Sequence, residues 1–241
     1  MRCCTSWKAT GGASSPTAGP SATRTKTPAP GVHRLILQQG LNGYTGTSDT
    51  YITSYTKDSP VTDRTRLKLK GPDVMSPLVR FDLAGQLPDG AYVVQAELVF
   101  YVDAGDRLRA LDVGAFRILQ AWDLAWVTWN SRMPGIPWGL PGCNQTGVDR
   151  AATPDEVRTF EYRAVYYGFQ VTDSVRYWQQ HPDENYGWVL KGLSASSGEF
   201  ELNSSVGGTP QERRPMLRID YRLDVTPSVT PSPNLTITAT H

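Results

Sequence analysis

The chain has 241 residues, and 24 Lys and Arg against 23 Asp and Glu give a formal net charge of +1 at pH 7. This length allows one large all-β domain or two smaller ones, and the ordinary apolar content excludes a chain that is disordered throughout. We expect no nucleic-acid partner, because the charges nearly cancel, and no membrane span, because the longest apolar stretch, residues 91–102, is short and contains polar residues.

Both ends of the chain have the composition of a linker. Residues 9–31 are mostly Ala, Gly, Ser, Thr and Pro, and residues 226–240 are rich in Thr, Ser and Pro. Such segments cannot bury a core and act as spacers. We therefore assign residues 1–32 and 224–241 as linkers and residues 33–223 as one globular domain. Linkers on both sides favour a module of a longer protein, with neighbouring domains as partners, at an extracellular or cell-surface location.

Apolar and polar residues alternate through most of the domain, which is the period of β-strands. In residues 93–102, for example, Leu98 and Phe100 lie on one face of the strand, and Glu97 and Tyr101 lie on the opposite face. Turn signals such as Pro-Asp-Gly and Asn-Gly separate the alternating segments. The predicted strands are, in chain order, 35–39, 50–54, 66–70, 77–83, 93–102, 115–121, 159–166, 187–191, 199–202 and 216–221.

One short helix interrupts this pattern at about residues 173–181. Asp173 is suited to cap its start, Val175 and Trp178 lie on one face, and Pro182 ends it. Strands that are apolar on one face need a second sheet to cover that face. The sequence therefore predicts an all-β fold, a two-sheet antiparallel β-sandwich of jelly-roll type with one short helix.

Several motifs occur in the order found in a known family, and together they cover almost the whole domain. They are 37–46 (LQQGLNGYTG), 48–52 (SDTYI), 78–83 (LVRFDL), 126–130 (WVTWN), 185–188 (NYGW) and 214–221 (RPMLRIDY). In this order they resemble a DNRLRE domain. The resemblance implies a jelly-roll-like β-sandwich from secreted multi-domain bacterial or archaeal proteins. Some members are similar to carbohydrate-binding modules, including modules attached to alginate lyases. The family has no catalytic signature.

The first candidate site is a row of cations on one predicted strand. Alternation places Leu67 and Leu69 inward, and the cations Arg64, Arg66, Lys68 and Lys70 outward on one face. Such a row matches a polyanion with regularly spaced carboxylates, such as a polyuronate. Alternatively, the charges protect an edge strand against aggregation. Arg80, on the polar face of its own strand, either extends the row or pairs with an acid.

Sugar binding also needs exposed aromatic rings, on which the C–H faces of sugars stack. Trp138 lies between Pro137 and Gly139 in a long loop, and we predict that it is an exposed platform. Tyr44 is a weaker candidate, because a Tyr in its turn can instead close the end of the sandwich. The other patterned tryptophans, Trp126, Trp129, Trp178 and Trp188, are predicted core residues.

Metal binding is only weakly indicated. Asp49, Asp103 and Asp106 lie near predicted turns, where carboxylates can hold calcium, but where they more often cap the turn itself. The interpretation requires no cofactor, and a structural calcium ion stays open as an alternative. Cys143 is predicted to be a free thiol.

No motif for a nucleophile elbow, a zinc protease or a phosphate-binding loop is present. The sequence therefore favours a non-catalytic carbohydrate-binding module that tethers a larger secreted protein to a polysaccharide, with an acidic polysaccharide as one candidate. Two alternatives are a structural spacer or adhesin module of a surface stalk or filament, and a glycan-active enzyme with a distributed active site.

Overall fold

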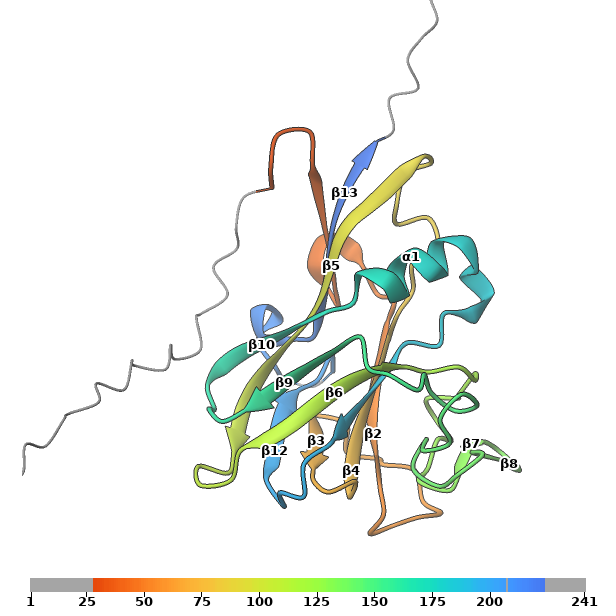
Figure 1. Ribbon diagram of the computed structural model, residues 1–241, viewed down its shortest axis with the longest axis vertical. Coiled ribbons are helices and arrows are strands. Elements are labelled where there is room, and N and C mark those ends of the chain that lie inside the picture. Colours follow the sequence, from red (N-terminus) through yellow and green to blue (C-terminus); the bar gives the residue numbers. More distant parts are fainter. Residues whose placement is uncertain (1–27, 207, 224–241) are drawn as a thin grey trace, which may run out of the picture.

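A computed structural model describes residues 28–206 and 208–223, which form an all-β structure with one α-helix (Figure 1). The strands are β1 (His33–Gln38), β2 (Thr47–Thr53), β3 (Arg66–Lys70), β4 (Met75–Phe81), β5 (Ala91–Gly105), β6 (Leu111–Arg117), β7 (Ser131–Met133), β8 (Ile136–Pro137), β9 (Glu156–Phe160), β10 (Val165–Gln170), β11 (Trp188–Gly192), β12 (Glu199–Asn203) and β13 (Met216–Leu223). The helix α1 spans Thr172–Gln180, and the 3-10 turns are η1 (Leu41–Gly43), η2 (Pro182–Glu184) and η3 (Gln211–Arg213). Within the described ranges, no helix is long and apolar enough to cross a membrane.

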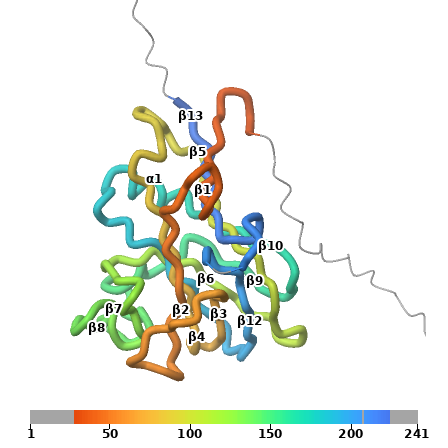
Figure 2. Tube along the Cα trace, turned by 180° about the vertical axis from the view of Figure 1, so that it is seen from behind, coloured from red at the N-terminus to blue at the C-terminus, as the bar shows by residue number. Residues whose placement is uncertain are grey.

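Eleven strands form one antiparallel sheet in the order β1-β13-β5-β12-β3-β4-β11-β6-β9, with β10 added beside β5 and β2 beside β4. The sheet curls so that its two halves face each other (Figures 1 and 2). Strands β7 and β8 form a separate small hairpin. The predicted antiparallel β-sandwich is confirmed. His33 of β1 pairs with Tyr221 of β13, so the two ends of the described domain lie together at one end of the sandwich.

Most predicted strands are present with shifted ends, but two local predictions were wrong. The predicted strand 159–166 is two strands, β9 and β10, because the chain turns between them at Ala164, which has a φ of 59°. Asp173 is not the helix cap; Val171 is, and Asp173 lies in the first turn. The buried face of α1 with Val175 and Trp178 is confirmed.

Two hydrophobic clusters lie on opposite faces of the sheet formed by β2, β4, β11 and β6. The main core fills the sandwich, where Trp178 of α1 packs edge-on against Trp188 of β11 with ring centroids 4.6 Å apart. The second cluster lies on the outer face, where alternation places Leu78 and Val189. The long loop after β6, which includes β7 and β8, covers this outer face.

Buried polar contacts hold this covering loop in place. The buried carboxylate of Asp149 accepts backbone N–H bonds from Gly139, Leu140 and Gln145 at 2.7–3.0 Å. The buried ammonium of Lys191 forms an ion pair with Asp73. It also donates a 2.8 Å hydrogen bond to the carbonyl of Gly142 in the loop. Backbone groups that would otherwise be buried without partners are satisfied in this way, so the loop has a defined conformation.

Candidate functional site

The predicted row of free cations on β3 is wrong, because each of its strand members faces an acid. The pairs are Arg66 with Asp103 at 2.9 Å, Lys68 with Glu201 at 3.6 Å and Lys70 with Glu199 at 2.8 Å. The acids at 199 and 201 lie directly opposite the lysines in the β3–β12 register. Cross-strand pairs of this kind neutralise each other. The alternative of a protected edge is also wrong, since β3 is hydrogen-bonded to both β12 and β4.

Arg64 precedes β3 and is not part of this ladder. Its guanidinium donates a long 3.5 Å hydrogen bond to the carbonyl of Leu124. Among the residues that the structure describes, it has no ion-pair partner, although it lies close enough to the buried Asp49 to lower the pKa of that carboxyl. Arg64 therefore lies beside the covering loop rather than in a row with Arg66.

Trp138 is not the exposed platform that we expected. Only 3% of its surface is exposed, and its indole nitrogen donates to the carbonyl of Thr128 at 3.1 Å. The ring belongs to the outer-face cluster, where the loop held by Asp149 packs onto the sheet. Neighbouring Pro and Gly residues therefore did not indicate exposure at this position.

Tyr44 is also buried, in agreement with the alternative that it closes the end of the sandwich. Its hydroxyl donates to the carbonyl of Asp82 at 3.1 Å, and burial raises the pKa of the phenol. A Cβ on Gly46 would lie 2.8 Å from this hydroxyl, so a larger residue at 46 would displace the ring. Tyr44 therefore supports the chain next to the cleft described below without offering a face to a ligand.

Among the described residues the exposed tryptophan is Trp126, which we expected in the core. Its exposed fraction is 57%, while the predicted core positions of Trp129, Trp178 and Trp188 are confirmed. The sequence signal was misleading because Trp126 and Trp129 are three residues apart, like partners on one helix face. Residues 124–126 instead form a turn that points the first ring outward.

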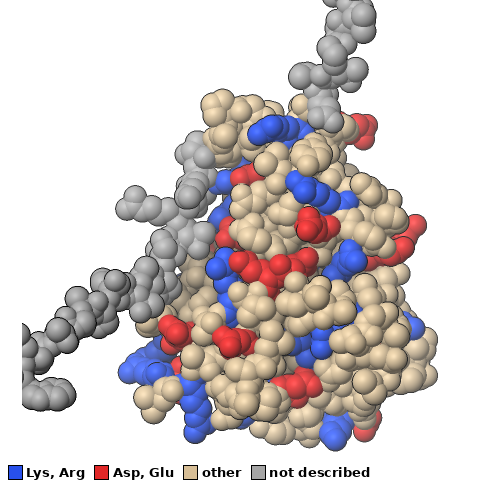
Figure 3. Space-filling view, viewed as in Figure 1, with Lys and Arg blue, Asp and Glu red and all other residues tan. Residues whose placement is uncertain are grey.

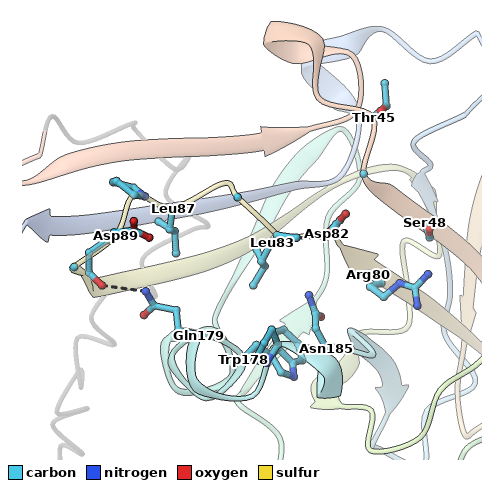
Figure 4. A pocket seen from close by; sticks show the side chains of 17 residues that line it. Thr45, Ser48, Arg80, Asp82, Leu83, Leu87, Asp89, Trp178, Gln179 and Asn185 are labelled. Carbon is cyan, nitrogen blue, oxygen red and sulfur yellow. Dashed lines mark hydrogen bonds between the residues drawn. The ribbon is translucent and has the colours of Figure 1, made fainter.

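Arg80 is the one cation of the predicted set that lines a cleft, which has a volume of about 660 Å³. The cleft lies between the segment after β4, the C-terminal part of α1 and the start of β2 (Figure 4). Its polar lining includes Thr45, Ser48, Arg80, Asp82, Asp89, Gln179 and Asn185, and its apolar lining includes Leu83, Leu87 and Trp178. Residues from three distant parts of the sequence therefore meet at one opening.

The guanidinium of Arg80 is held in place without being neutralised. It lies over the ring of Trp122, 5.6 Å from the centroid, and the indole nitrogen of Trp122 is fixed by a 2.8 Å bond to the carbonyl of Tyr186. Within residues 28–206 and 208–223, Arg80 has no ion pair and no hydrogen bond from its guanidinium. Its partner across the β2–β4 ladder is Ser48, which is neutral. Arg80 thus presents free N–H donors at the cleft.

Asn185 borders the same cleft. Its amide nitrogen donates to the carbonyl of Phe81 at 2.8 Å, and its side-chain oxygen is buried without a hydrogen-bond partner in the described part of the chain. Figure 4 shows the side chain of Asn185 between α1 and the strand that holds Arg80. The amide therefore ties the segment after α1 to the end of β4, where the cleft opens.

Two more polar side chains of the cleft are positioned by the backbone around it. The amide of Gln179 donates to the carbonyl of Ala91 at 3.0 Å, as drawn in Figure 4. The carboxylate of Asp82 accepts the N–H of Ala84 at 3.0 Å and keeps free acceptor positions. A half-open cleft with planar donors and acceptors above an apolar floor has the chemistry that polyhydroxylated ligands require.

The face of the molecule in Figure 3 shows acidic and basic side chains interspersed over the surface. The ladder of pairs on β3 continues across the sheet, where Arg34 meets Asp220 and Arg218 meets Glu97, both at 2.7 Å. Attraction of an anionic ligand would therefore depend on individual unpaired cations such as Arg80.

The carboxylates considered for calcium have protein partners. Asp49 accepts two bonds from Ser205, at 2.7 Å from its N–H and 3.0 Å from its hydroxyl. Asp103 pairs with Arg66, and Asp106 accepts the N–H of Leu108 at 2.9 Å. In the described part of the chain, no three His, Cys, Asp or Glu residues are grouped as metal ligands. Cys143, the free thiol of this part, is buried.

Comparison with known proteins gives one positive result. The search of curated proteins found no significant match. The model of carbohydrate-binding module family 96 matches residues 42–220, a range that includes nearly all of the sandwich, the cleft and the covering loop. The chain belongs to carbohydrate-binding module family 96.

Proposed function

We propose that this chain is a non-catalytic module that binds an acidic polysaccharide in the cleft beside Arg80. Membership of a carbohydrate-binding family supports the ligand class, and the resemblance of the sequence motifs to DNRLRE domains agrees with it. The observation on which the proposal depends is the guanidinium of Arg80, which lines the cleft and has no ion pair within the described residues.

The guanidinium explains the preference for an acid. Arg binds a carboxylate through two parallel N–H···O bonds, which are about twice as strong as neutral hydrogen bonds. The ring of Trp122 beneath Arg80 restricts its rotamers, so less conformational entropy is lost when the ligand binds. A uronic acid residue would place its carboxylate on Arg80.

The sugar hydroxyls would bind the remaining polar groups. The carboxylates of Asp82 and Asp89 accept hydroxyl hydrogens, and Gln179 offers its amide oxygen. The partly exposed side chains of Leu83 and Leu87 form an apolar floor that suits the C–H face of the ring. None of these contacts requires a metal ion or another cofactor.

The module would serve as a tether for a neighbouring domain of a secreted protein. The two ends of the described domain lie together, as the pairing of His33 with Tyr221 shows. Neighbouring domains attached through the predicted linkers would then leave the sandwich from one end. An extracellular or cell-surface location is part of this proposal.

The test is affinity electrophoresis and calorimetry with alginate, pectin, xylan and chitin at low salt. We expect binding to the two acidic polymers, with an affinity that falls as salt is added. Arg80→Ala should weaken binding roughly 10- to 100-fold, because hydrogen bonds to a charged group contribute about 1.5–3 kcal/mol. Arg80→Lys keeps the charge but loses the paired donors, so its affinity should lie between those of the wild type and of Arg80→Ala.

Arg107→Ala is the matched control. Arg107 is exposed in the segment between β5 and β6, outside the cleft, and it also has no ion pair in the described part of the chain. Its replacement should leave the affinity unchanged. Equal affinities of Arg80→Ala and wild type would refute the cleft as the binding site. An absence of binding to every polymer would favour the structural spacer, and new reducing ends or unsaturated sugars would indicate an enzyme.

A further inference from the structure

Trp126 is the exposed exception among the tryptophans of the described residues. Its ring is 57% exposed, whereas the other five are at most 6% exposed. The neighbours on its C-terminal side, Val127 and Thr128, are buried as well. The exposed indole offers a flat aromatic face on which the C–H face of a sugar ring can stack.

The turn that presents Trp126 is fixed on both sides. The carboxylate of Asp123 accepts the N–H of Ala125 at 2.7 Å, and its carbonyl accepts the N–H of Val127 at 2.8 Å. The N–H of Asp123 in turn donates to the carbonyl of Arg132 at 3.0 Å. The backbone that carries the ring is already ordered, so a ligand that stacks on it orders only the side chain.

This turn follows closely on the ring that packs beneath Arg80, a residue of the cleft lining. Trp122, which lies beneath the guanidinium of Arg80, is four residues before Trp126. Four residues of extended chain span at most about 14 Å, so the backbones of the two tryptophans lie within that distance. A second cation without an ion pair, Arg64, contacts the same turn at the carbonyl of Leu124.

We infer that Trp126 is a second sugar subsite, on which a residue of the polysaccharide held in the cleft stacks while Arg64 binds its carboxylate. The inference rests on the proposed function and adds the direction of the chain, from Arg80 past Trp122 to Trp126. Arg80 over the ring of Trp122 and Arg64 at the turn of Trp126 are two separate cations, which match carboxylates on separate residues of one polymer. The site therefore recognises several linked residues rather than a single sugar.

Fragments of alginate with two and eight residues test this inference by calorimetry. A two-residue fragment fills the cleft alone, whereas an eight-residue fragment reaches both subsites. Trp126→Ala should therefore bind the long fragment roughly tenfold more weakly and the short fragment as wild type does. Tyr162→Ala, which removes a similarly exposed ring from the turn between β9 and β10, is the matched control and should change neither affinity.

The wavelength of tryptophan emission gives an independent readout. The measurement uses a Trp7→Phe background, so that the signal comes only from tryptophans that the structure describes. The long fragment should shift the emission to shorter wavelength, because the ring of Trp126 leaves water, and the shift should be absent after Trp126→Ala. Arg80→Ala should lower the affinity for both fragments. If the Arg80→Ala protein binds both fragments with the affinity of the wild type, the cleft proposal itself fails.

If Arg80→Ala weakens binding but Trp126→Ala does not, only the second subsite is overturned. If Trp126→Ala lost the same factor of affinity for the short and the long fragment, the second subsite would also be overturned. A wild type that sediments as a dimer, with a monomeric Trp126→Ala of unchanged affinity, would instead assign the ring to contact with a second copy.

Discussion

Asp49 provides a test of the buried electrostatics of the domain. The side chain is 2% exposed, and burial, the largest cause, raises the pKa of its carboxyl from 3.8 to about 6 despite two hydrogen bonds from Ser205. At about 1.36 kcal/mol for each pKa unit, this rise corresponds to about 3 kcal/mol. The native state binds the extra proton between about pH 4 and pH 6, so this contribution to stability is complete at low pH and lost as the pH rises through 6.

The variant Asp49→Asn isolates this contribution. An Asn side chain keeps both bonds to Ser205, since its oxygen accepts the N–H and its nitrogen donates to the hydroxyl. Urea unfolding of the wild type and of Asp49→Asn at about pH 3.5 and pH 7.5 gives, at each pH, the difference between the two proteins in the free energy of unfolding. We expect the difference to move by about 3 kcal/mol in favour of Asn at the higher pH. Any structural cost of the substitution cancels in this comparison, so an unchanged difference would refute a raised pKa at Asp49.

Three further predictions concern residues that the structure moves out of the candidate site. Arg66→Ala with Lys68→Ala should leave polysaccharide affinity unchanged in electrophoresis and lower stability by no more than about 1 kcal/mol for each partly exposed pair, whereas a loss of binding would return the site to β3. Trp138→Ala should lower the free energy of unfolding by about 3–5 kcal/mol in a urea titration, as for a core aromatic, and a loss under 1 kcal/mol would contradict its burial. Burial raises the pKa of the Cys143 thiol to about 12, so in a background without the two N-terminal cysteines a thiol reagent should label the protein only in denaturant.

Strand alternation was sufficient to predict the sandwich, because the period of two depends only on neighbouring residues. It placed Arg80 on a polar face, and the family motifs included two of the segments that meet in the cleft, 78–83 and 185–188. It could not reveal that the lysines of β3 are neutralised, since Glu199 and Glu201 are about 130 positions away and only the β3–β12 register aligns them.

The aromatic predictions failed for a related reason. Exposure in the covering loop depends on the backbone groups that Asp149 holds within the loop and that Lys191 of β11 holds from outside it, and neither set of contacts follows from residue type. Trp138, flanked by residues typical of exposed loops, is therefore pulled into the outer cluster. Trp126, at a spacing typical of a core helix, is turned outward.

The partner across the ladder explains why Arg80 has no ion pair in the described residues whereas the lysines of β3 do. Lys68 and Lys70 face glutamates, whereas Arg80 faces Ser48, and residues that face each other in an antiparallel pair project from the same side of the sheet. Ser48→Glu should therefore give Arg80 the ion pair that the lysines already have. We expect affinity for alginate to fall at least tenfold, while Ser48→Gln, of equal size and no charge, should lose much less. Equal losses in the two variants would mean that Ser48 acts through the shape of the cleft, and that the free charge of Arg80 is not what binds the ligand.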